Sequence, residues 1–578
     1  MTPLAQLRAA LATQKLDGFI LPVNDEFMGE YVPESAKRLT WLTGFTGSAG
    51  MAVALSDKAA FFTDGRYTLQ AKTEVQGFEL FNSGDVTPEK WISEYAPKEA
   101  VIGYDPKLHT LQSLRRYEQD AKNVAWKAIT PNPIDALWKD RPIAPASAVR
   151  IHPLQYAGEA SSDKRTRIAK QIEVLGADAA ILTAPDSICW LLNIRGSDVP
   201  FTPFILCYAL LAKSGAVTIY LDEKRISPEA KTHLGKDVIV KSPAQLTADI
   251  AAFAQQRVLY SSTSSPVWFY QELRRAEALI VEASDPCVLP KARKNKTELE
   301  GMRQAHIRDG RAVTKFLYWL EKCKEPLTEM GVAAKLEEFR KQSELYLEPS
   351  FTTISGSGPN GAVVHYRVTE ATNRPLDTDS LLLIDSGGQY LDGTTDITRT
   401  VARGKPSAEM KDSFTRVLKG HIALARAVFP EGTTGAQLDA LARQYLWQEG
   451  LDYDHGTGHG VGSYLSVHEG PQGISKRASS VALEPGMILS NEPGYYKAGE
   501  YGIRIENLVA VEEVFKDENG KRFFGFETIT LVPIDMRLVD KALLTAEEKK
   551  WLREHHWRVY EAHATSLTAY EDDWLEHQ

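Results

Sequence analysis

Apolar residues near the start of the chain recur at a spacing that predicts a helix followed by a strand. Leu4, Leu7, Ala10 and Leu11 would share one face of the helix. The continuous apolar run GFILP then predicts a buried strand. This order of helix and strand is typical of an α/β domain.

One order of elements occurs twice in the first half of the chain. Each copy has an apolar strand, a Trp-Leu pair, a turn that contains glycine, and a strand that ends in Asp, with Trp41 and Trp190 in matching places. The Pro-rich stretch KDRPIAPASAVRIHP between the copies is typical of a linker. The repeat predicts two related α/β domains, residues 1–148 and 149–290.

The pattern changes after residue 290, where a long amphipathic helix begins. Thr297 and Glu300 predict a capping box at its start. The apolar positions of one helical face are Leu299, Met302, Val313, Phe316, Leu317 and Leu320. Strand-like runs and Gly-rich turns follow, and from about residue 540 the chain returns to helix, with a second capping box at Thr545 and Glu548. We expect a third domain, residues 291–578, with a helical extension at its end.

Composition narrows the class of protein. Hydrophobic residues make up 43% of the 578 positions, which predicts a well-packed multidomain protein. The net charge of −9 argues against a nucleic-acid partner or an anionic membrane surface. None of the four cysteines stands in a C-x-x-C pair. No apolar run is long enough for a membrane span, and the N-terminal segment lacks a signal-peptide pattern, so we expect a cytoplasmic protein.

Two carboxylates interrupt the apolar strand LLLID and the segment after it. Asp385 and Asp396 would lie directly opposite each other in a hairpin centred on Tyr390 and Leu391. Opposed Cβ atoms are about 4.5–5.5 Å apart, a spacing that suits two carboxylates on one cation. Two buried like charges otherwise need a shared proton. The alternative is that each Asp is an ordinary strand-end or turn residue.

The sequence also predicts the kind of turn that connects the two strands. A two-residue turn at Asp392-Gly393 would shift the register by four residues from the one that opposes the two Asp side chains. We therefore expect a longer or bulged connection, which Gly387-Gly388 would supply.

Further candidate ligands follow along the chain. The Gly-rich segment DHGTGHGVGSYLSVHEGP contains three histidines, and neutral imidazole is a common metal ligand. Glu492 ends an apolar strand, and Arg504 and Glu506 share one face of another. A plain salt bridge between Arg504 and Glu506 is the alternative for that pair. The histidines are His455, His459 and His468.

Taken together, four carboxylates and one imidazole form a candidate site for two divalent cations. The ligands would be Asp385, Asp396, His459, Glu492 and Glu506. The carboxylates carry a charge of about −4 when ionised, which two divalent ions balance. Oxygen-rich ligands favour hard cations such as Mn²⁺ or Mg²⁺ over a thiolate-type zinc site. Two ions about 3.5–4 Å apart can share a hydroxide and polarise a carbonyl, which indicates hydrolysis.

The order and wording of these motifs resemble a known family. DSGGQYLDGTTDITRT, HGTGHGVGSYLSVHEGP, NEPGYY and GIRIENL are similar to segments of the three-domain Xaa-Pro aminopeptidases, which are pita-bread metallopeptidases. The resemblance extends over essentially the whole chain. It implies two related α/β domains of the creatinase/prolidase N-terminal type, followed by a catalytic pita-bread domain.

The resemblance also implies a role for each metal ligand. Asp385 would chelate one ion, Asp396 and Glu506 would bridge both ions, and His459 and Glu492 would hold the other ion. A hydroxide that bridges the metals would attack the carbonyl of the first residue, with Glu492 as proton shuttle. The implied cofactors are two divalent ions, with Mn²⁺ expected to be the most active and Zn²⁺, Co²⁺ or Mg²⁺ as other candidates.

Other site residues carry over from the same resemblance. His365 and His468 would line the substrate site and steady the tetrahedral intermediate, and His455 would be a further substrate-binding histidine. Arg504 would brace the bridging carboxylates, and Arg66 would contact the substrate from the first domain.

The implied activity is removal of the first residue from peptides with proline at position two, by a cytosolic homodimer. The bond before proline lacks an N–H, so a pocket for the pyrrolidine ring must replace that hydrogen bond. A prolidase, which cleaves only Xaa-Pro dipeptides, is one alternative, although prolidases resemble a shorter plan. A non-catalytic binding protein with the same fold is another, and the intact ligand set argues against it.

Overall fold

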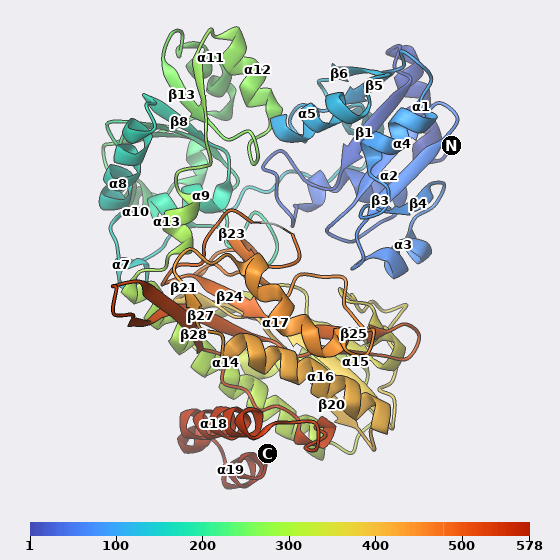
Figure 1. Cartoon of the computed structure of the whole chain (residues 1–578). Helices are drawn as coiled ribbons and strands as arrows, with labels where there is room; N and C mark the ends of the chain where they lie inside the picture. The colour runs from blue at the N-terminus through green and yellow to red at the C-terminus, as the bar shows by residue number, and fades with distance from the viewer. Residues whose placement is uncertain (478) are drawn as a thin grey trace. The chain divides into compact units, whose positions relative to one another are not determined.

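The computed structural model describes residues 1–477 and 479–578, which divide into two compact units. Unit 1 comprises Met1–Leu154 and Glu159–Val288, and unit 2 comprises Gln155–Gly158 and Leu289–Gln578. The colour bar of Figure 1 identifies the segments of each unit by residue number. Among the described residues, no helix is both long and apolar enough to cross a bilayer.

Unit 1 contains two six-stranded sheets with the same topology. Each sheet has an interior strand, β1 or β8, that pairs antiparallel on one side and parallel on the other. The strands of the first sheet, in spatial order, are β4 (Glu79–Asn82), β3 (Ala59–Thr63), β2 (Met51–Leu55), β1 (Gly18–Pro22), β5 (Val101–Tyr104) and β6 (Ala125–Ala128). Those of the second sheet are β12 (Val238–Lys241), β11 (Val217–Tyr220), β10 (Tyr208–Ala212), β8 (Ala179–Leu182), β13 (Arg257–Tyr260) and β14 (Leu279–Glu282).

The helices of unit 1 follow the repeat that the sequence shows. Trp41 lies in α2 and Trp190 lies in α9, and each of these short helices comes after the interior strand of its sheet. The helices are α1 (Pro3–Thr13), α2 (Arg38–Thr43), α3 (Thr68–Glu74), α4 (Pro88–Tyr95), α5 (Leu111–Asp120), α6 (Pro133–Leu137), α8 (Ser161–Val174), α9 (Pro185–Leu192), α10 (Pro228–Leu234), α11 (Leu246–Ala251) and α12 (Val267–Arg275). Both sheets fall within one compact unit, so the boundary predicted between residues 148 and 149 stays a prediction.

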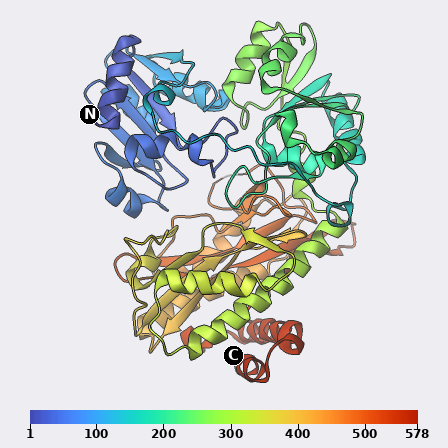
Figure 2. The same ribbon diagram turned by 180° about the vertical axis from the view of Figure 1, so that it is seen from behind.

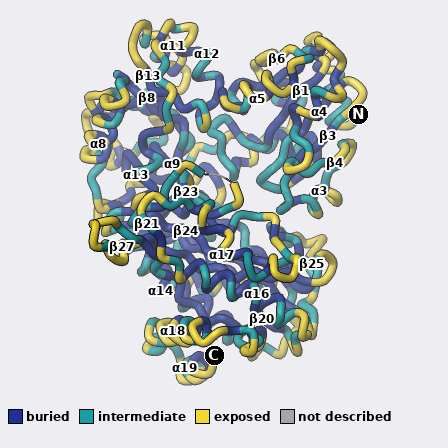
Figure 3. Tube along the Cα trace, in the orientation of Figure 1, coloured by how far each residue is buried: buried dark blue, intermediate teal, exposed yellow. Residues whose placement is uncertain are grey.

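Unit 2 places its strands between two layers of helices. Figure 1 shows α16 and α17 in front of the strands, and Figure 2, the view from behind, shows α14 and α15 (yellow-green) crossing the opposite face. The helices are α14 (Lys296–Lys322), α15 (Glu329–Arg340), α16 (Ala408–Ala425), α17 (Gly435–Trp447), α18 (Ala546–His563) and α19 (Ala569–Glu576). Figure 3 shows that the strands are mostly buried, whereas α18 and α19 have exposed faces.

The strands of unit 2 form several small sheets and one larger sheet. The larger sheet has the order β21 (Phe429–Pro430), β28 (Arg522–Thr528), β27 (Asn507–Lys516), β24 (Ile488–Asn491), β22 (Gly458–Gly460) and β23 (Glu469–Ile474). The smaller sheets contain β15 (Tyr346–Pro349), β18 (Gly388–Tyr390) and β19 (Gly393–Thr394); β16 (Ile354–Ser357), β17 (Ser380–Ser386) and β20 (Ile397–Arg403); and β25 (Gly494–Lys497) and β26 (Tyr501–Arg504).

The start of α14 differs from the sequence prediction. The capping box consists of Asn295 and Glu298, not of Thr297 and Glu300. The Asn295 side chain accepts hydrogen bonds from the N–H groups of Thr297 and Glu298, and the Glu298 carboxylate accepts one from the N–H of Asn295. Asn is as good an N-cap as Thr, so spacing alone did not distinguish the two registers. The second predicted capping box, Thr545 with Glu548, is confirmed.

Helices α16 and α17 pack so closely at Gly420 that there is no space for a methyl group between them. A Cβ atom added at Gly420 would lie 2.0 Å from the carbonyl oxygen of Ala442. We expect Gly420→Ala to lower the free energy of unfolding by about 1–3 kcal/mol through overpacking. Differential scanning calorimetry would measure the fall in Tm. The matched control Gly331→Ala, at an exposed position of α15, is expected not to lower the free energy of unfolding, because Ala has the higher helix propensity.

Candidate metal centre

The strand that carries Asp385 pairs with the strand after Asp396, but not in the predicted register. Asp385 lies opposite Thr398, and the same register continues to the pairs Gln389 with Thr394 and Tyr390 with Gly393. The hairpin therefore turns through two residues, Leu391 and Asp392. The expected direct opposition of Asp385 and Asp396 was wrong by two residues, and the expected longer or bulged connection was also wrong.

Gly387 and its neighbours explain this register. A Cβ atom at Gly387 would lie 1.9 Å from the carbonyl oxygen of Thr395, so only glycine allows the two strands to approach this closely. The Thr395 hydroxyl accepts a hydrogen bond from the N–H of Gly388 and donates one to buried Asp309. These contacts interrupt the ladder without changing its register.

The two Asp side chains converge in spite of the offset. Asp396 lies just before β20, two residues from Thr398, and Asp385 lies opposite Thr398 in the ladder. Residues two apart in extended chain point to the same side, so Asp396 is the diagonal neighbour of Asp385. Ligand oxygens of Asp385, Asp396 and Glu506 all lie within 4.8 Å of one another, and all three residues are buried. A diagonal cross-strand relation thus brings together the carboxylates that direct opposition was expected to join.

His459 and Glu492 complete the cluster from the larger sheet. Ligand atoms of His459, Glu492 and Glu506 lie within 4.8 Å of one another. The Nε2 atom of His459 is 3.4 Å from Asp396 Oδ2 and 3.4 Å from Glu492 Oε1. Its Nδ1 atom lies 2.9 Å from the carbonyl oxygen of Gly460. An Nδ1–H donor to that carbonyl leaves Nε2 as the ligand atom that faces the carboxylates.

The electrostatics of the cluster call for positive charge. Burial raises the pKa of Asp396 to about 6. Burial and the charges of Asp396 and Glu492 raise the pKa of Glu506 well above its ordinary value. Burial alone lowers the pKa of His459, but the hydrogen bond with Asp396 and the nearby carboxylates raise it to about 9. The protein therefore concentrates acidic groups where their ionised forms are costly.

The ligand atoms that point inward fit a cation. Asp385 Oδ1, Asp396 Oδ1 and Glu506 Oε1 are buried and have no hydrogen-bond partner among the described residues. Unsatisfied buried carboxylate oxygens are expensive unless an ion coordinates them. The donor set is therefore suited to divalent metal ions.

Arg504 braces the centre from one side and links it to His455. Its Nη2 atom donates to Asp385 Oδ2 at 2.6 Å, and its Nη1 atom donates to the Tyr496 hydroxyl at 2.6 Å. The Tyr496 hydroxyl also lies 2.9 Å from His455 Nε2. The Thr398 hydroxyl donates to Glu506 Oε2 at 2.7 Å. Arg504 and Glu506 thus make no plain salt bridge with each other: the guanidinium pairs with Asp385.

Arg399 supports the backbone next to the metal ligands, and the sequence prediction did not include it. This buried guanidinium donates to the carbonyl oxygens of Thr398 and Glu506 and to the Asn507 side chain. It also donates to the carbonyl oxygens of Val532 and Pro533, in the segment before α18. Its position in TDITRT near Asp396 was the only signal in the sequence, since all the partners named here except the adjacent Thr398 lie more than a hundred residues away.

The remaining predicted site residues occupy different surroundings. His468 joins Asp396 and His459 in a group whose ligand atoms lie within 4.8 Å of one another, and its ring centroid is 4.3 Å from that of His459. His365 lies in the turn after the 3-10 helix Gly358–Ala362, partly exposed. Arg66 belongs to unit 1, where it forms an ion pair with Asp64 at 2.7 Å, and its substrate contact stays a prediction.

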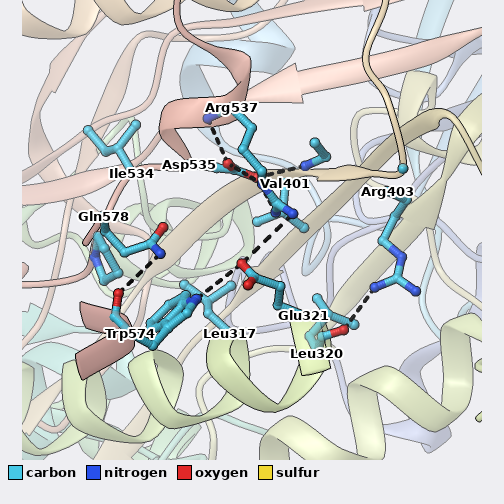
Figure 4. A pocket seen from close by; sticks show the side chains of 13 residues that line it. Leu317, Leu320, Glu321, Val401, Arg403, Ile534, Asp535, Arg537, Trp574 and Gln578 are labelled. Atoms are coloured by element: carbon cyan, nitrogen blue, oxygen red, sulfur yellow. Dashed lines mark hydrogen bonds and ion pairs between the residues drawn. The ribbon is translucent and has the colours of Figure 1, made fainter. Parts of the chain in front are cut away.

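A separate cavity of about 180 Å³ in unit 2 lies between α14, β20 and the C-terminal segment (Figure 4). Its polar side chains make ion pairs and hydrogen bonds with other residues of the cavity wall. Arg537 pairs with Asp535, Trp574 donates to Glu321, and Arg403 donates to the carbonyl oxygen of Leu320. No predicted site residue is among the described residues that line this cavity.

Comparison with known proteins places this architecture in a family. The model of metallopeptidase family M24 matches residues 300–513, and that of the C-terminal region of peptidase M24 matches residues 522–578. Two models of the creatinase/prolidase N-terminal domain match residues 3–137 and 140–298. A probable Xaa-Pro aminopeptidase P from Aspergillus fumigatus is 41% identical over 96% of this chain and 89% of its own length. The chain belongs to metallopeptidase family M24, in its Xaa-Pro aminopeptidase P branch.

Solved structures agree with membership of family M24. The X-prolyl aminopeptidase of Caenorhabditis elegans, described as a cytosolic enzyme with a di-nuclear active site, matches with a TM-score of 0.95 and 34% identity over 100% of this chain and 98% of its own. The prolidase of Pyrococcus horikoshii shares the fold over 64% of this chain and 99% of its own, with a TM-score of 0.51 and 23% identity. The predicted fold class and the prediction of a metallopeptidase are confirmed.

Thr398 offers a test of this M24 centre that leaves its ligands in place. Thr398→Val keeps the side-chain shape but removes the hydroxyl that donates to Glu506. We expect the affinity for divalent ions to fall by about 10- to 100-fold, as for other groups that orient ligands. Isothermal titration calorimetry would measure the change. Thr415→Val, the same substitution in α16, is expected to leave the affinity unchanged.

Proposed function

We propose that this protein is a dinuclear Xaa-Pro aminopeptidase, which removes the first residue from peptides with proline at the second position. The observation that carries the proposal is the convergence of three buried carboxylates with His459 and Glu492, where each of the three has one oxygen without a hydrogen-bond partner in the described part of the chain. The relatives named Xaa-Pro aminopeptidase P cover nearly the whole chain and so support the same activity.

Five side chains would hold two divalent ions in this proposal. Asp385 would bind one ion, Asp396 and Glu506 would bind both, and His459 with Glu492 would bind the other. Carboxylate oxygens with one imidazole favour a hard ion, and we propose Mn²⁺ ahead of Zn²⁺, Co²⁺ or Mg²⁺. When bound, the ions supply Lewis-acid polarisation of the scissile carbonyl and lower the pKa of water.

The side chains around the ligands would move protons and stabilise charge. Glu492 is less buried than the other carboxylates, and the Ser490 hydroxyl orients it by donating to its Oε1 atom at 3.0 Å. We assign Glu492 the transfer of a proton from the attacking water to the leaving proline nitrogen. His468 and His365 would donate hydrogen bonds to the oxyanion of the tetrahedral intermediate.

The same site would account for removal of a single residue. The free amino terminus of a peptide would lie against the ions and their carboxylate ligands, which would place the first peptide bond at the reacting position. His455, held by Tyr496, would contact the residues that follow. A cytosolic location and a homodimeric assembly are part of the proposal and rest on the family resemblance.

Restoring metal to the stripped protein tests the proposal. We expect hydrolysis of a Xaa-Pro-Yaa tripeptide to need added divalent ion, and Mn²⁺ to restore the highest rate among Mn²⁺, Zn²⁺, Co²⁺ and Mg²⁺. Asp396→Asn and Glu506→Gln are each expected to lower kcat by more than about 100-fold. Release of the first amino acid, measured by chromatography, gives the rates.

Thermal unfolding supplies the control for these variants. Mn²⁺ is expected to raise the Tm of the wild-type protein, because an ion that binds only the folded state stabilises it. The metal-free variants are expected to be at least as stable as the metal-free wild type, since each loses one of the repelling carboxylates. Wild-type rates in either variant would refute the bridging role.

A comparison of substrates separates this activity from that of a prolidase. We expect Xaa-Pro-Yaa tripeptides to be cleaved with a kcat/KM at least about tenfold above that of the matching Xaa-Pro dipeptide, a difference of about 1.4 kcal/mol in transition-state stabilisation. Parallel progress curves with the same first residue would measure the ratio. Faster cleavage of the dipeptide would favour the prolidase alternative.

A further inference from the structure

A cluster of buried charges lies directly beside His468. Glu469 is the next residue, begins β23, and its side chain is inaccessible to solvent. Its Oε1 atom lies 2.6 Å from Lys294 Nζ, and its Oε2 atom lies 2.7 Å from Lys291 Nζ. Both lysine side chains are at most 2% exposed. Fully buried lysines are rare unless they are paired, so this carboxylate holds both of them in place.

The two lysines fix the segment before α14 in unit 2. Lys291 belongs to α13 (Val288–Ala292), and Lys294 lies in the short turn before α14. The backbone N–H of Lys294 also donates to the carbonyl oxygen of Gly486, just before β24. The segment is thus fixed to the larger sheet by its backbone as well as by its side chains. Burial lowers the pKa of Lys294, and the charge of Glu469 opposes that shift.

Glu469 lies where β22, which carries His459, contacts β23, which begins directly after His468. It pairs with Gly460 across β22 and β23, and the register of this pairing shifts between His459 and Gly460. A Cβ atom at Gly460 would lie 2.1 Å from the carbonyl oxygen of Glu469, so the two strands are in close contact. Such irregularities redirect side chains next to active sites. Glu469 therefore adjoins His468 in the chain and the strand of His459 in space.

We propose that Glu469, clamped by Lys291 and Lys294, is a positioning residue that holds His468 in its reactive orientation. The inference rests on the proposed function, in which His468 stabilises the oxyanion. The loop from Val461 to His468 has no regular secondary structure, and the clamp fixes its end. A misplacement of about 1 Å in a catalytic group can cost about 100-fold in rate. A purely structural anchor for α14 is the competing explanation.

Glu469→Gln keeps the shape of the side chain and removes its charge. We expect kcat for a Xaa-Pro-Yaa tripeptide to fall by about 10- to 100-fold. KM is expected to change by less than about twofold, because an oxyanion donor acts in the transition state. Elemental analysis is expected to find the same metal content as in the wild type. An unchanged kcat in folded, metal-loaded Glu469→Gln would overturn the proposal.

A double-mutant cycle distinguishes positioning from structural support. If Glu469 acts through His468, the variant His468→Ala with Glu469→Gln is expected to be no slower than His468→Ala alone. Equal losses in both backgrounds would instead assign Glu469 an independent role. The matched control is Glu548→Gln, which breaks the Lys419 ion pair at 2.7 Å between α16 and α18. It is expected to lower Tm without changing kcat.

Variants of Lys294 provide an independent test of the proposal if Glu469→Gln does not fold. Lys294→Arg retains the charge and is expected to keep at least about one-third of the wild-type kcat, whereas Lys294→Met is expected to match the loss in Glu469→Gln. Equal kcat values for Lys294→Arg and Lys294→Met would contradict the clamp. If the wild-type protein cleaves the tripeptide, equal kcat values for the two variants refute only the positioning role of Glu469. If the wild-type protein does not cleave the tripeptide, the proposed function itself is refuted.

Discussion

Carboxylates that are buried side by side repel one another, and unit 2 is organised around a place where this repulsion is concentrated. Asp385 lies in β17, Asp396 just before β20 and Glu506 just before β27, and their ligand oxygens come within a few ångströms of each other. Burial raises the pKa of Asp396 and of Glu506, and each has a buried oxygen with no hydrogen-bond partner among the described residues. Divalent cations satisfy such oxygens, so the same constraint that strains the fold creates the capacity to bind metal.

The surrounding groups hold the carboxylates without neutralising the oxygens that face inward. Arg504 donates to one oxygen of Asp385, and Thr398 donates to one oxygen of Glu506. The other oxygen of each side chain has no hydrogen-bond partner among the residues that the structure describes. Arg399 binds the backbone on both sides of the cluster and joins it to the segment before α18. Rigid support of this kind pre-organises ligands, because the cost of gathering them is met during folding.

Much of the chemistry was readable from the sequence, because residue type and local spacing determine it. The strand before Asp385, the strand that ends before Glu492 and the Gly-rich frame of His459 all follow from short-range patterns. The repeat of elements around Trp41 and Trp190 corresponds to two sheets of one topology in unit 1. The family resemblance then assigned a role to each member of the ligand set.

What the sequence alone determined was which residues are available as ligands; their mutual positions were decided only by the tertiary structure. The register that places Asp385 opposite Thr398 depends on close contact at Gly387 and on Asp309, a residue of α14. The partners of Arg399 and the lysine clamp on Glu469 likewise join segments more than a hundred positions apart. Such contacts leave no local periodicity, because they arise from packing of whole elements and not from neighbouring residues.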